Sequence, residues 1–313
     1  MENGESDFKL IAEFCGMFDQ TSSQNTIHKI DELKNSRTEA EIVPVYNYLL
    51  SICQQPDVMM HLIRNLDMYR HPSSLEILVD ILLLKNGTCQ TPEDKEKYTK
   101  VRVMCAKAIA NQKNTDVVSS LLYCLNNKKE NYRIRLACAD ALGRIGDRYA
   151  VAPLIDVVKD EDEKSVYVRE SAALALGLLG DERAIDPLVS ILEAKQGIMD
   201  KFSFLKERAI EALNRMGFGS NERVFKALKN SLSDESSQVR INSIEALMEC
   251  DHPQAFETIK KCLYEDIDEE VKKNAMIALY NMSDKNILYE VIESDKFSDN
   301  LKNEAKQIIE EYE

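Results

Sequence analysis

Small and apolar residues recur at helical spacing along most of the chain. One segment begins at Ile134 (IRLACADALGRIGDRYAVAPLIDVV), and a second, beginning at Val168 (VRESAALALGLLGDERAIDPLVSIL), aligns with it directly. Weaker copies begin at Val101, Leu205, Val239, Val271 and Leu301. Successive copies start 30 to 37 residues apart. A period near 33 residues is the length of two helices and two turns, so the pattern predicts a helical-hairpin repeat.

Each copy carries the signals that begin and end helices. In the copy at Val168, apolar and small residues fall on one face of a helix that ends at Leu179. Gly180 suits a left-handed helix end, and Asp181 is placed to cap the next helix. Pro187 then either bends that next helix or belongs to its first turn.

One position of the repeat holds only small side chains. Stacked helices need small residues where they approach closely, so this column predicts tight packing between neighbouring repeats. Its members are Cys105, Cys138, Ala172, Ala209, Ser243, Ala275 and Ala305.

The first 95 residues do not fit the repeat, although they are helical in pattern. They predict a divergent helical N-terminal cap over 1–95, followed by an array of about six to seven repeats over 96–313. The polar stretch Asn86–Lys97 is predicted to be the connecting loop. A last helix, Leu301–Tyr312, would cover the other end. The helices expected in the first region are Asp7–Phe18, Thr26–Lys34, Ala40–Cys53, Val58–Met68 and Ser73–Leu84.

The skeleton VRxxAAxALGxxGDxxAxxPLxxxL resembles the HEAT-like repeat of the phycobilisome-lyase type and the designed binding scaffolds built on it. The match is strong over 132–193 and fair over 98–131 and 201–285. The resemblance implies an all-α, right-handed α-solenoid (superhelix) whose second helices line a concave surface. Most members of the family are interaction modules. A minority attach or detach bilins, and related repeats with His-Glu pairs hold a di-iron site in deoxyhypusine hydroxylase, so the resemblance indicates fold better than function.

Charge and hydropathy narrow the possible partners and the compartment. The net charge is −14, from 40 basic and 54 acidic residues, which disfavours nucleic acid and anionic membranes as partners. A secretory signal and an apolar run long enough to span a bilayer are both missing from the sequence, so we expect a cytoplasmic protein. The eight Cys are scattered, which predicts reduced thiols in the core.

The sequence lacks the common motifs of catalytic, metal-binding and phosphate-binding sites. No His is followed by Glu, so the His-Glu pairs of the di-iron relatives are missing, and no HExxH, GxGxxG, P-loop or GxSxG motif occurs. Acidic runs such as Asp160–Glu163 are typical of solvated turns. We therefore expect no catalytic residue, no metal site and no cofactor, and the sequence favours a chain that is not an enzyme.

A basic column accompanies the small one, at Arg102, Arg135, Arg169, Lys206, Arg240, Lys272 and Lys302. It could form a ladder for phosphate groups. In the family that the chain resembles, such residues instead pair with acidic groups of the adjacent repeat at the turn. Asp160 or Asp162 is suitably placed to pair with Arg169.

The designed scaffolds also imply where a partner would bind, because their variable positions face the groove. Six of the corresponding positions here are apolar although a solvent-facing helix position is normally polar. Such exposure is typical of binding surfaces. Alternatively, superhelical curvature or the first 95 residues bury these side chains. The groove positions are Tyr132, Arg133, Leu136, Asp140, Arg144, Tyr167, Glu170, Ser171, Leu174, Leu178, Phe204, Glu207, Arg208, Glu211 and Arg215.

Three functions are compatible with these features. The favoured one is a non-catalytic scaffold that binds a partner protein in the groove, whose later part is made acidic by Glu245, Glu249, Glu269 and Glu270. A phycobilin-lyase-like protein that handles a chromophore is the first alternative, and it would need a deep apolar pocket with a reactive Cys or His. A nucleic-acid-binding solenoid is the second, and it would need a basic groove.

Overall fold

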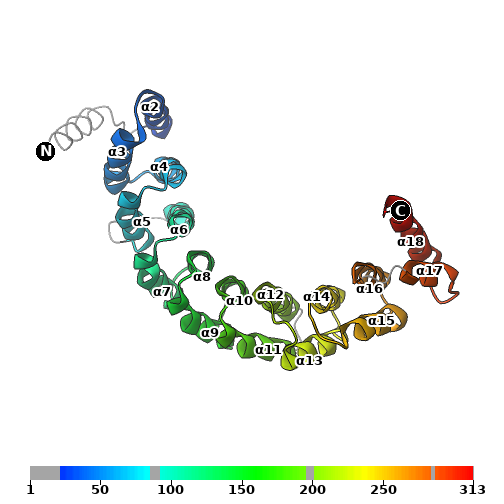
Figure 1. The fold of residues 1–313 in the computed structure, drawn as a ribbon. Coiled ribbons are helices and arrows are strands. Elements are labelled where there is room, and N and C mark those ends of the chain that lie inside the picture. Colours follow the sequence, from blue (N-terminus) through cyan, green and yellow to red (C-terminus); the bar gives the residue numbers. More distant parts are fainter. Residues whose placement is uncertain (1–21, 85–91, 195–200, 283–285, 313) are drawn as a thin grey trace. The chain divides into compact units, whose positions relative to one another are not determined.

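The computed structural model describes residues 22–84, 92–194, 201–282 and 286–312, which form α-helices, short 3-10 turns and connecting segments (Figure 1). Within these residues there is no strand. The helices form an all-α solenoid of stacked hairpins. Contacts within the chain divide it into two compact units, Met1–Pro153 and Leu154–Glu313, and each is described by itself below.

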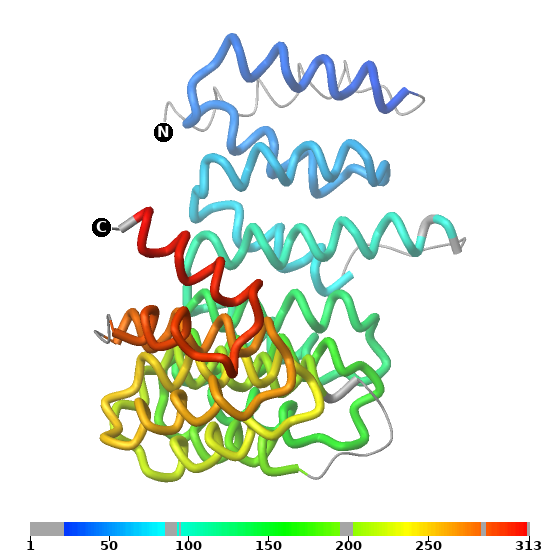
Figure 2. Tube along the Cα trace, turned by 90° about the vertical axis from the view of Figure 1, so that its right-hand side faces the viewer, coloured from blue at the N-terminus to red at the C-terminus, as the bar shows by residue number. Residues whose placement is uncertain are grey.

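In the first unit, α4, α6 and α8 pack in succession as one layer, and α5 and α7 pack against α6 and α8 from the other side. Figure 2 shows α4 and α6 stacked with their axes running across the view. The expected helices of this region are confirmed within a few residues, except that Asp7–Phe18 lies outside the described residues. The helices are α2 (Ser23–Ser36), α3 (Glu39–Ile52), α4 (Pro56–Tyr69), α5 (Leu75–Leu82), α6 (Pro92–Gln112), α7 (Val118–Asn126) and α8 (Tyr132–Ile145), with α9 (Val151–Lys159) crossing into the second unit.

In the second unit, α10, α12, α14 and α16 pack in succession, and each is followed by a helix of a second layer. The helices are α10 (Val166–Leu179), α11 (Ile185–Glu193), α12 (Lys201–Met216), α13 (Glu222–Ser231), α14 (Ser237–Met248), α15 (Ala255–Glu265), α16 (Glu269–Asn281), α17 (Asn286–Glu293) and α18 (Asp299–Tyr312).

The predicted repeat is confirmed. All seven starting residues fall in even-numbered helices, from Val101 in α6 to Leu301 in α18. The small-residue column is wholly buried, since each of its seven residues is 0% exposed. The even-numbered helices therefore approach each other closely at the small-residue position, as the sequence pattern predicted.

The turns follow the local sequence. Gly180 adopts a left-handed φ of 62°, and Asp181 Oδ1 accepts a hydrogen bond of 3.1 Å from the backbone N–H of Arg183. This cap begins a short 3-10 turn, Glu182–Ala184, that leads into α11. Pro187 is the third residue of α11, so it belongs to the first turn, where its missing N–H has no helical partner to lose.

The expectation of a loop over Asn86–Lys97 was wrong from Pro92 onward, because α6 begins there. The polarity of this stretch suggested a loop, but polar residues can form the exposed first turns of a helix. Proline is favoured at a helix start, and an ion pair of 3.1 Å joins Glu93 to Lys97 one turn later.

The cysteines of the described residues are buried and free, as expected for core side chains: Cys53, Cys105, Cys124, Cys138, Cys250 and Cys262. Burial raises the pKa of the Cys53 thiol to about 11 and that of Cys262 to about 12. Both therefore stay protonated at neutral pH.

Within the described ranges, no helix has both the length and the apolar character that crossing a bilayer requires.

Candidate protein-binding face

Five residues of the basic column serve the fold: Arg102, Arg135, Arg169, Lys206 and Arg240. Arg102, Arg135 and Arg169 each donate a hydrogen bond from Nε to a backbone carbonyl, at 2.7, 2.7 and 3.0 Å. The acceptors, Leu82, Leu125 and Val158, lie at the ends of α5, α7 and α9. The last carbonyls of a helix have no partner within it and carry partial negative charge, so each arginine caps the helix before its own.

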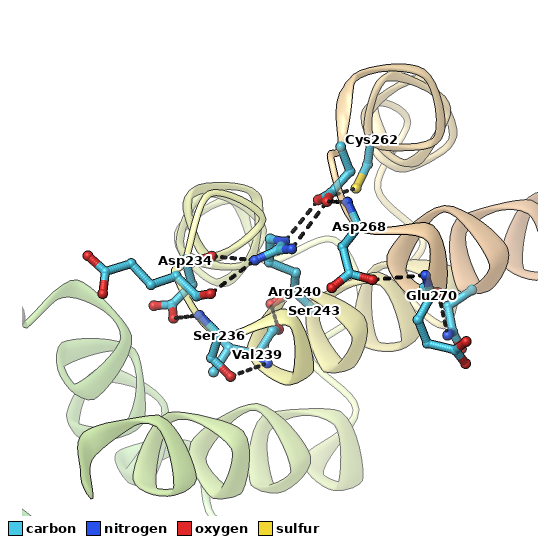
Figure 3. A network of polar contacts seen from close by, with 11 residues as sticks. Asp234, Ser236, Val239, Arg240, Ser243, Cys262, Asp268 and Glu270 are labelled. Atoms are coloured by element: carbon cyan, nitrogen blue, oxygen red, sulfur yellow. Dashed lines mark hydrogen bonds and ion pairs between the residues drawn. The ribbon is translucent and has the colours of Figure 1, made fainter. Parts of the chain in front are cut away.

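Arg102, Lys206 and Arg240 form buried ion pairs with the turn of the next repeat, as expected, and the partner of Arg102 is Glu130. Lys206 Nζ lies 2.6 Å from Asp234, and the guanidinium of Arg240 contacts both carboxylate oxygens of Asp266, at 2.9 and 3.2 Å. Arg240 also donates to the backbone carbonyl of Asp234 at 2.8 Å. Figure 3 shows Arg240 held between Asp234 and the carboxylate beside Cys262. Because Lys206 and Arg240 already have partners within the fold, they do not form a ladder for phosphate groups.

Arg169 was expected to pair with Asp160 or Asp162. Its Nε hydrogen bond goes to the Val158 carbonyl instead. Burial lowers the pKa of the Arg169 guanidinium. The negative charges of Glu161, Asp160 and Glu163 oppose this change but do not cancel it.

The candidate residues on α10 and α12 form two matching rows. On each helix they fall at i, i+3, i+4, i+7 and i+11, which is one face. Tyr167 and Phe204 begin the two rows and are each 56% exposed, while Leu178 is 45% exposed. Leu174 and Ser171 are half-buried. Large apolar side chains are thus open to solvent on two adjacent helices of one unit.

Charged residues on α12 border these apolar side chains. Glu211 accepts from Arg208 at 2.6 Å and from Arg215 at 3.0 Å, so one carboxylate serves two guanidinium groups. Glu207, expected on the open face, is only 8% exposed. Burial raises the pKa of Glu207 and of Glu170 above the ordinary 4.5, although Arg208 opposes the change.

In the first unit, the candidate residues of α8 contact neighbouring helices. Arg133 forms an ion pair of 2.5 Å with Glu96 of α6 and lies 5.9 Å from the centre of the Tyr132 ring. Arg144 donates to Asn111 of α6 at 2.7 Å and lies 4.0 Å from Asp140. Tyr132 is 41% exposed and Leu136 is half-buried.

Farther along the second unit, the face becomes acidic. Glu245 is exposed on α14, Glu249 is exposed directly after it, and Glu269 and Glu270 are exposed at the start of α16. Glu269 is near Lys272, at 3.5 Å, and also accepts from Ser298.

A separate hollow of about 1170 Å³ opens between α13 and α15, beside the Arg240 ion pair. Lys229 and Lys261 line it together with Glu235, Glu257 and Glu265. This mixture of charges selects neither anions nor cations.

The histidines of the described part have structural contacts. His61 lies 2.8 Å from Asp31, and His252 stacks on Phe225 and contacts Glu222 at 3.0 Å. His28 lies 3.4 Å from Glu32, and His71 caps a 3-10 turn. No cluster of three His, Cys, Asp or Glu side chains suited to a metal ion occurs among the described residues.

Sequence reasoning missed the acidic partners of the basic column. Glu130, Asp234 and Asp266 lie 28, 28 and 26 residues after Arg102, Lys206 and Arg240. That nearly constant offset, slightly less than one repeat, is the signal that could have found them. The helix-capping role of the arginines leaves no such signal, because any residue can supply a carbonyl.

The sequence model of the HEAT-repeat family matches residues 94–166, 128–214 and 199–280 of this chain. No curated protein matches its sequence.

Several solved structures are similar at low sequence identity. The phycocyanin lyase CpcE–CpcF complex from Nostoc sp. PCC7120 is 20% identical, with a TM-score of 0.44 over 76% of this chain and 88% of that one. Human deoxyhypusine hydroxylase is 15% identical, with a TM-score of 0.36 over 90% and 98%. The karyopherin Kap121p bound to the SUMO protease Ulp1p is 13% identical, with a TM-score of 0.51 over 95% of this chain and 36% of that one.

Proposed function

Because the chain belongs to the HEAT-repeat family, we propose that it is a non-catalytic scaffold that binds a partner protein through the exposed face of α10 and α12. The contacts proposed there are Tyr167, Glu170, Ser171, Leu174, Leu178, Phe204, Glu207, Arg208, Glu211 and Arg215. Tyr132, Arg133, Leu136, Asp140 and Arg144 are proposed as contacts on α8 of the first unit.

The observation that carries this proposal is the pairing of exposed rings on adjacent helices. Tyr167 and Phe204 occupy equivalent positions of successive repeats, and each leaves more than half of its surface open. Exposed aromatic side chains on a rigid surface are typical anchors of protein interfaces, and a charged rim like that of Arg208, Glu211 and Arg215 commonly surrounds them.

The relatives support a protein partner in general terms. Kap121p, whose fold this chain resembles, has been solved with a bound protein. Repeat arrays present extended surfaces that suit large ligands better than small ones.

The test is the double change Tyr167→Ala with Leu174→Ala. Affinity purification from the native cells, followed by a dissociation constant for the purified partner, compares this variant with the wild type. We expect binding to weaken tenfold or more, because truncating a buried anchor commonly costs about 2 kcal/mol. The helical signal and melting temperature should stay nearly unchanged, since neither side chain lies in the core.

Arg183→Ala is the matched control. Arg183 is exposed and pairs with Asp181 at the turn before α11. This variant should bind and melt like the wild type. If the double variant unfolds, Tyr167 and Leu174 support the core instead of a binding face. If it folds and binds the partner normally, this face is not the binding site.

A further inference from the structure

Glu170 and Glu207 occupy a position of the repeat that is apolar in neighbouring copies. Two residues after the seven repeat starts stand Val103, Leu136, Glu170, Glu207, Ile241, Lys273 and Asn303, so the copies directly before and after the two glutamates are apolar there. Ile241 is 7% exposed and Leu136 is half-buried, so the position faces partly into the protein. Two successive carboxylates therefore stand between copies that have an apolar residue at the same partly buried position.

Glu207 is buried and Glu170 is half-buried, and neither carboxylate has a counter-charge in contact. Glu207 is 8% exposed, and Oε1 of Glu170 is fully buried and lacks a hydrogen-bond partner. Within the part of the chain that is described, neither forms an ion pair. Arg208, whose charge acts on both carboxylates, donates to Glu211 instead. Burying a carboxylate without a partner is unfavourable, so the arrangement suits a site that a ligand completes.

The surroundings restrict what the ligand can be. Tyr167 and Phe204 lie one helical turn before the two glutamates on the same face, and Leu174 lies one turn after Glu170. Two carboxylates beside exposed rings match a guanidinium group, which binds carboxylates in a bidentate manner and stacks on aromatic faces. A metal ion would find only these two free carboxylates, because Glu211 is already shared between two arginines.

We propose that Glu170 and Glu207 together bind an arginine side chain in a segment of the partner protein. This inference rests on the proposed function and adds the chemistry of the partner. The arginine would supply the charge that the two carboxylates lack, and its aliphatic part would contact Leu174. The surrounding charge is complementary, since Glu245 on α14 of the adjacent repeat and Glu249 directly after that helix are exposed.

The first experiment selects ligands from a library of random twelve-residue peptides displayed on phage, using the full chain as bait. We expect the selected peptides to share an arginine next to aliphatic or aromatic residues. Replacing that arginine in a synthetic peptide by citrulline, which keeps the shape but loses the charge, should weaken binding tenfold or more. Lysine should weaken binding less, because it keeps the charge but not the planar fork.

The matching change in the protein is Glu170→Gln with Glu207→Gln. This variant should bind the arginine peptide at least tenfold more weakly and should no longer distinguish it from the citrulline peptide. It should remain folded, because amides remove the buried charges without changing side-chain shape. Peptides selected without arginine, or equal binding by wild type and variant, would overturn the inference.

The native partner separates this inference from the proposed function. If Tyr167→Ala/Leu174→Ala abolishes capture while Glu170→Gln/Glu207→Gln binds normally, the face is correct and the arginine site is wrong. If both variants bind normally, the proposed function fails as well. Ca²⁺ or Mg²⁺ alone should leave the melting temperature unchanged, and stabilisation of the wild type but not of the Gln variant would identify a metal site instead.

Discussion

Gly177 of α10 lies so close to Ala212 of α12 that a Cβ added to the glycine would be 2.7 Å from the Cα of the alanine. Real Cβ atoms do not approach a backbone atom to that distance, so the two helices can pack this closely only with glycine at 177. About two turns earlier on α10 lies Glu170, whose negative charge adds to burial in raising the pKa of Glu207 on α12. The close packing therefore also explains how two carboxylates come to influence each other across the two helices.

Gly177→Ala should destabilise the protein. Alanine normally stabilises a helix relative to glycine by up to about 1 kcal/mol, so a loss would reveal the steric conflict. We expect a net cost of about 1–3 kcal/mol in urea unfolding, because the backbone of α12 must move. Glu182→Ala, at an exposed position, should change stability little. A melting temperature equal to or above that of the wild type would contradict the close approach.

Ala172→Leu tests the small-residue column. Ala172 is 0% exposed, so three added carbons have no space and should cost about 1–3 kcal/mol. Glu161→Ala, in an exposed turn, should cost well under 1 kcal/mol. Thermal unfolding followed by circular dichroism measures the stability of both variants. Equal stability would show that Ala172 does not lie on the packed face.

Arg240→Met tests the buried ion pair with Asp266. The side chains of Arg240 and Asp266 are 10% and 6% exposed, and removing one partner of such a pair typically costs about 3–5 kcal/mol. Adding Asp266→Leu should recover part of this loss, because the unpaired carboxylate is then gone as well. Chemical denaturation gives the three free energies. If the double variant were no more stable than Arg240→Met, the pair would not be the source of the loss.

The pH dependence of stability tests the buried carboxylates. Because the pKa values of Glu170 and Glu207 are raised on folding, their protonation favours the folded state. That contribution is fully present below the ordinary 4.5 and is lost as the pH rises through the folded pKa values. Glu170→Gln/Glu207→Gln should therefore raise the melting temperature at pH 7 by roughly 2 °C. The advantage over the wild type should shrink as the pH falls toward 4, and an advantage independent of pH would contradict the raised pKa values.

The sequence predicted the repeat because its signals are local. Ala172, Gly180 and Asp181 recur in register with the helices that they pack, end and cap, so one copy suffices to interpret the others. The start of α6 at Pro92 was missed because a polar segment can be either a loop or an exposed first turn, and capping decides between them. The apolar positions Tyr167 and Phe204 were identified because the repeat resembles the designed scaffolds, whose variable positions face the groove.

Burial of Glu207 could not be predicted in the same way. Helical spacing assigns Glu207 to the same face as Phe204, yet one is 8% and the other 56% exposed. That difference depends on the distance between α10 and α12, which the contact between Gly177 and Ala212 sets. Sequence pattern gives the direction of a side chain from its own helix, but its depth depends on the neighbouring helix.

The ion pair between Arg240 and Asp266 has a consequence for where the array can be cut. Arg240 belongs to α14, but its carboxylate comes from the turn that precedes α16. A truncated chain that ends before Asp266 would keep a buried cation and lose its counter-ion. Lys272 instead lies near Glu269 of its own helix, at 3.5 Å, so a chain that ends after α16 leaves it with that neighbour. Shortened versions of the protein should therefore end beyond residue 281 rather than at the close of α14 or α15.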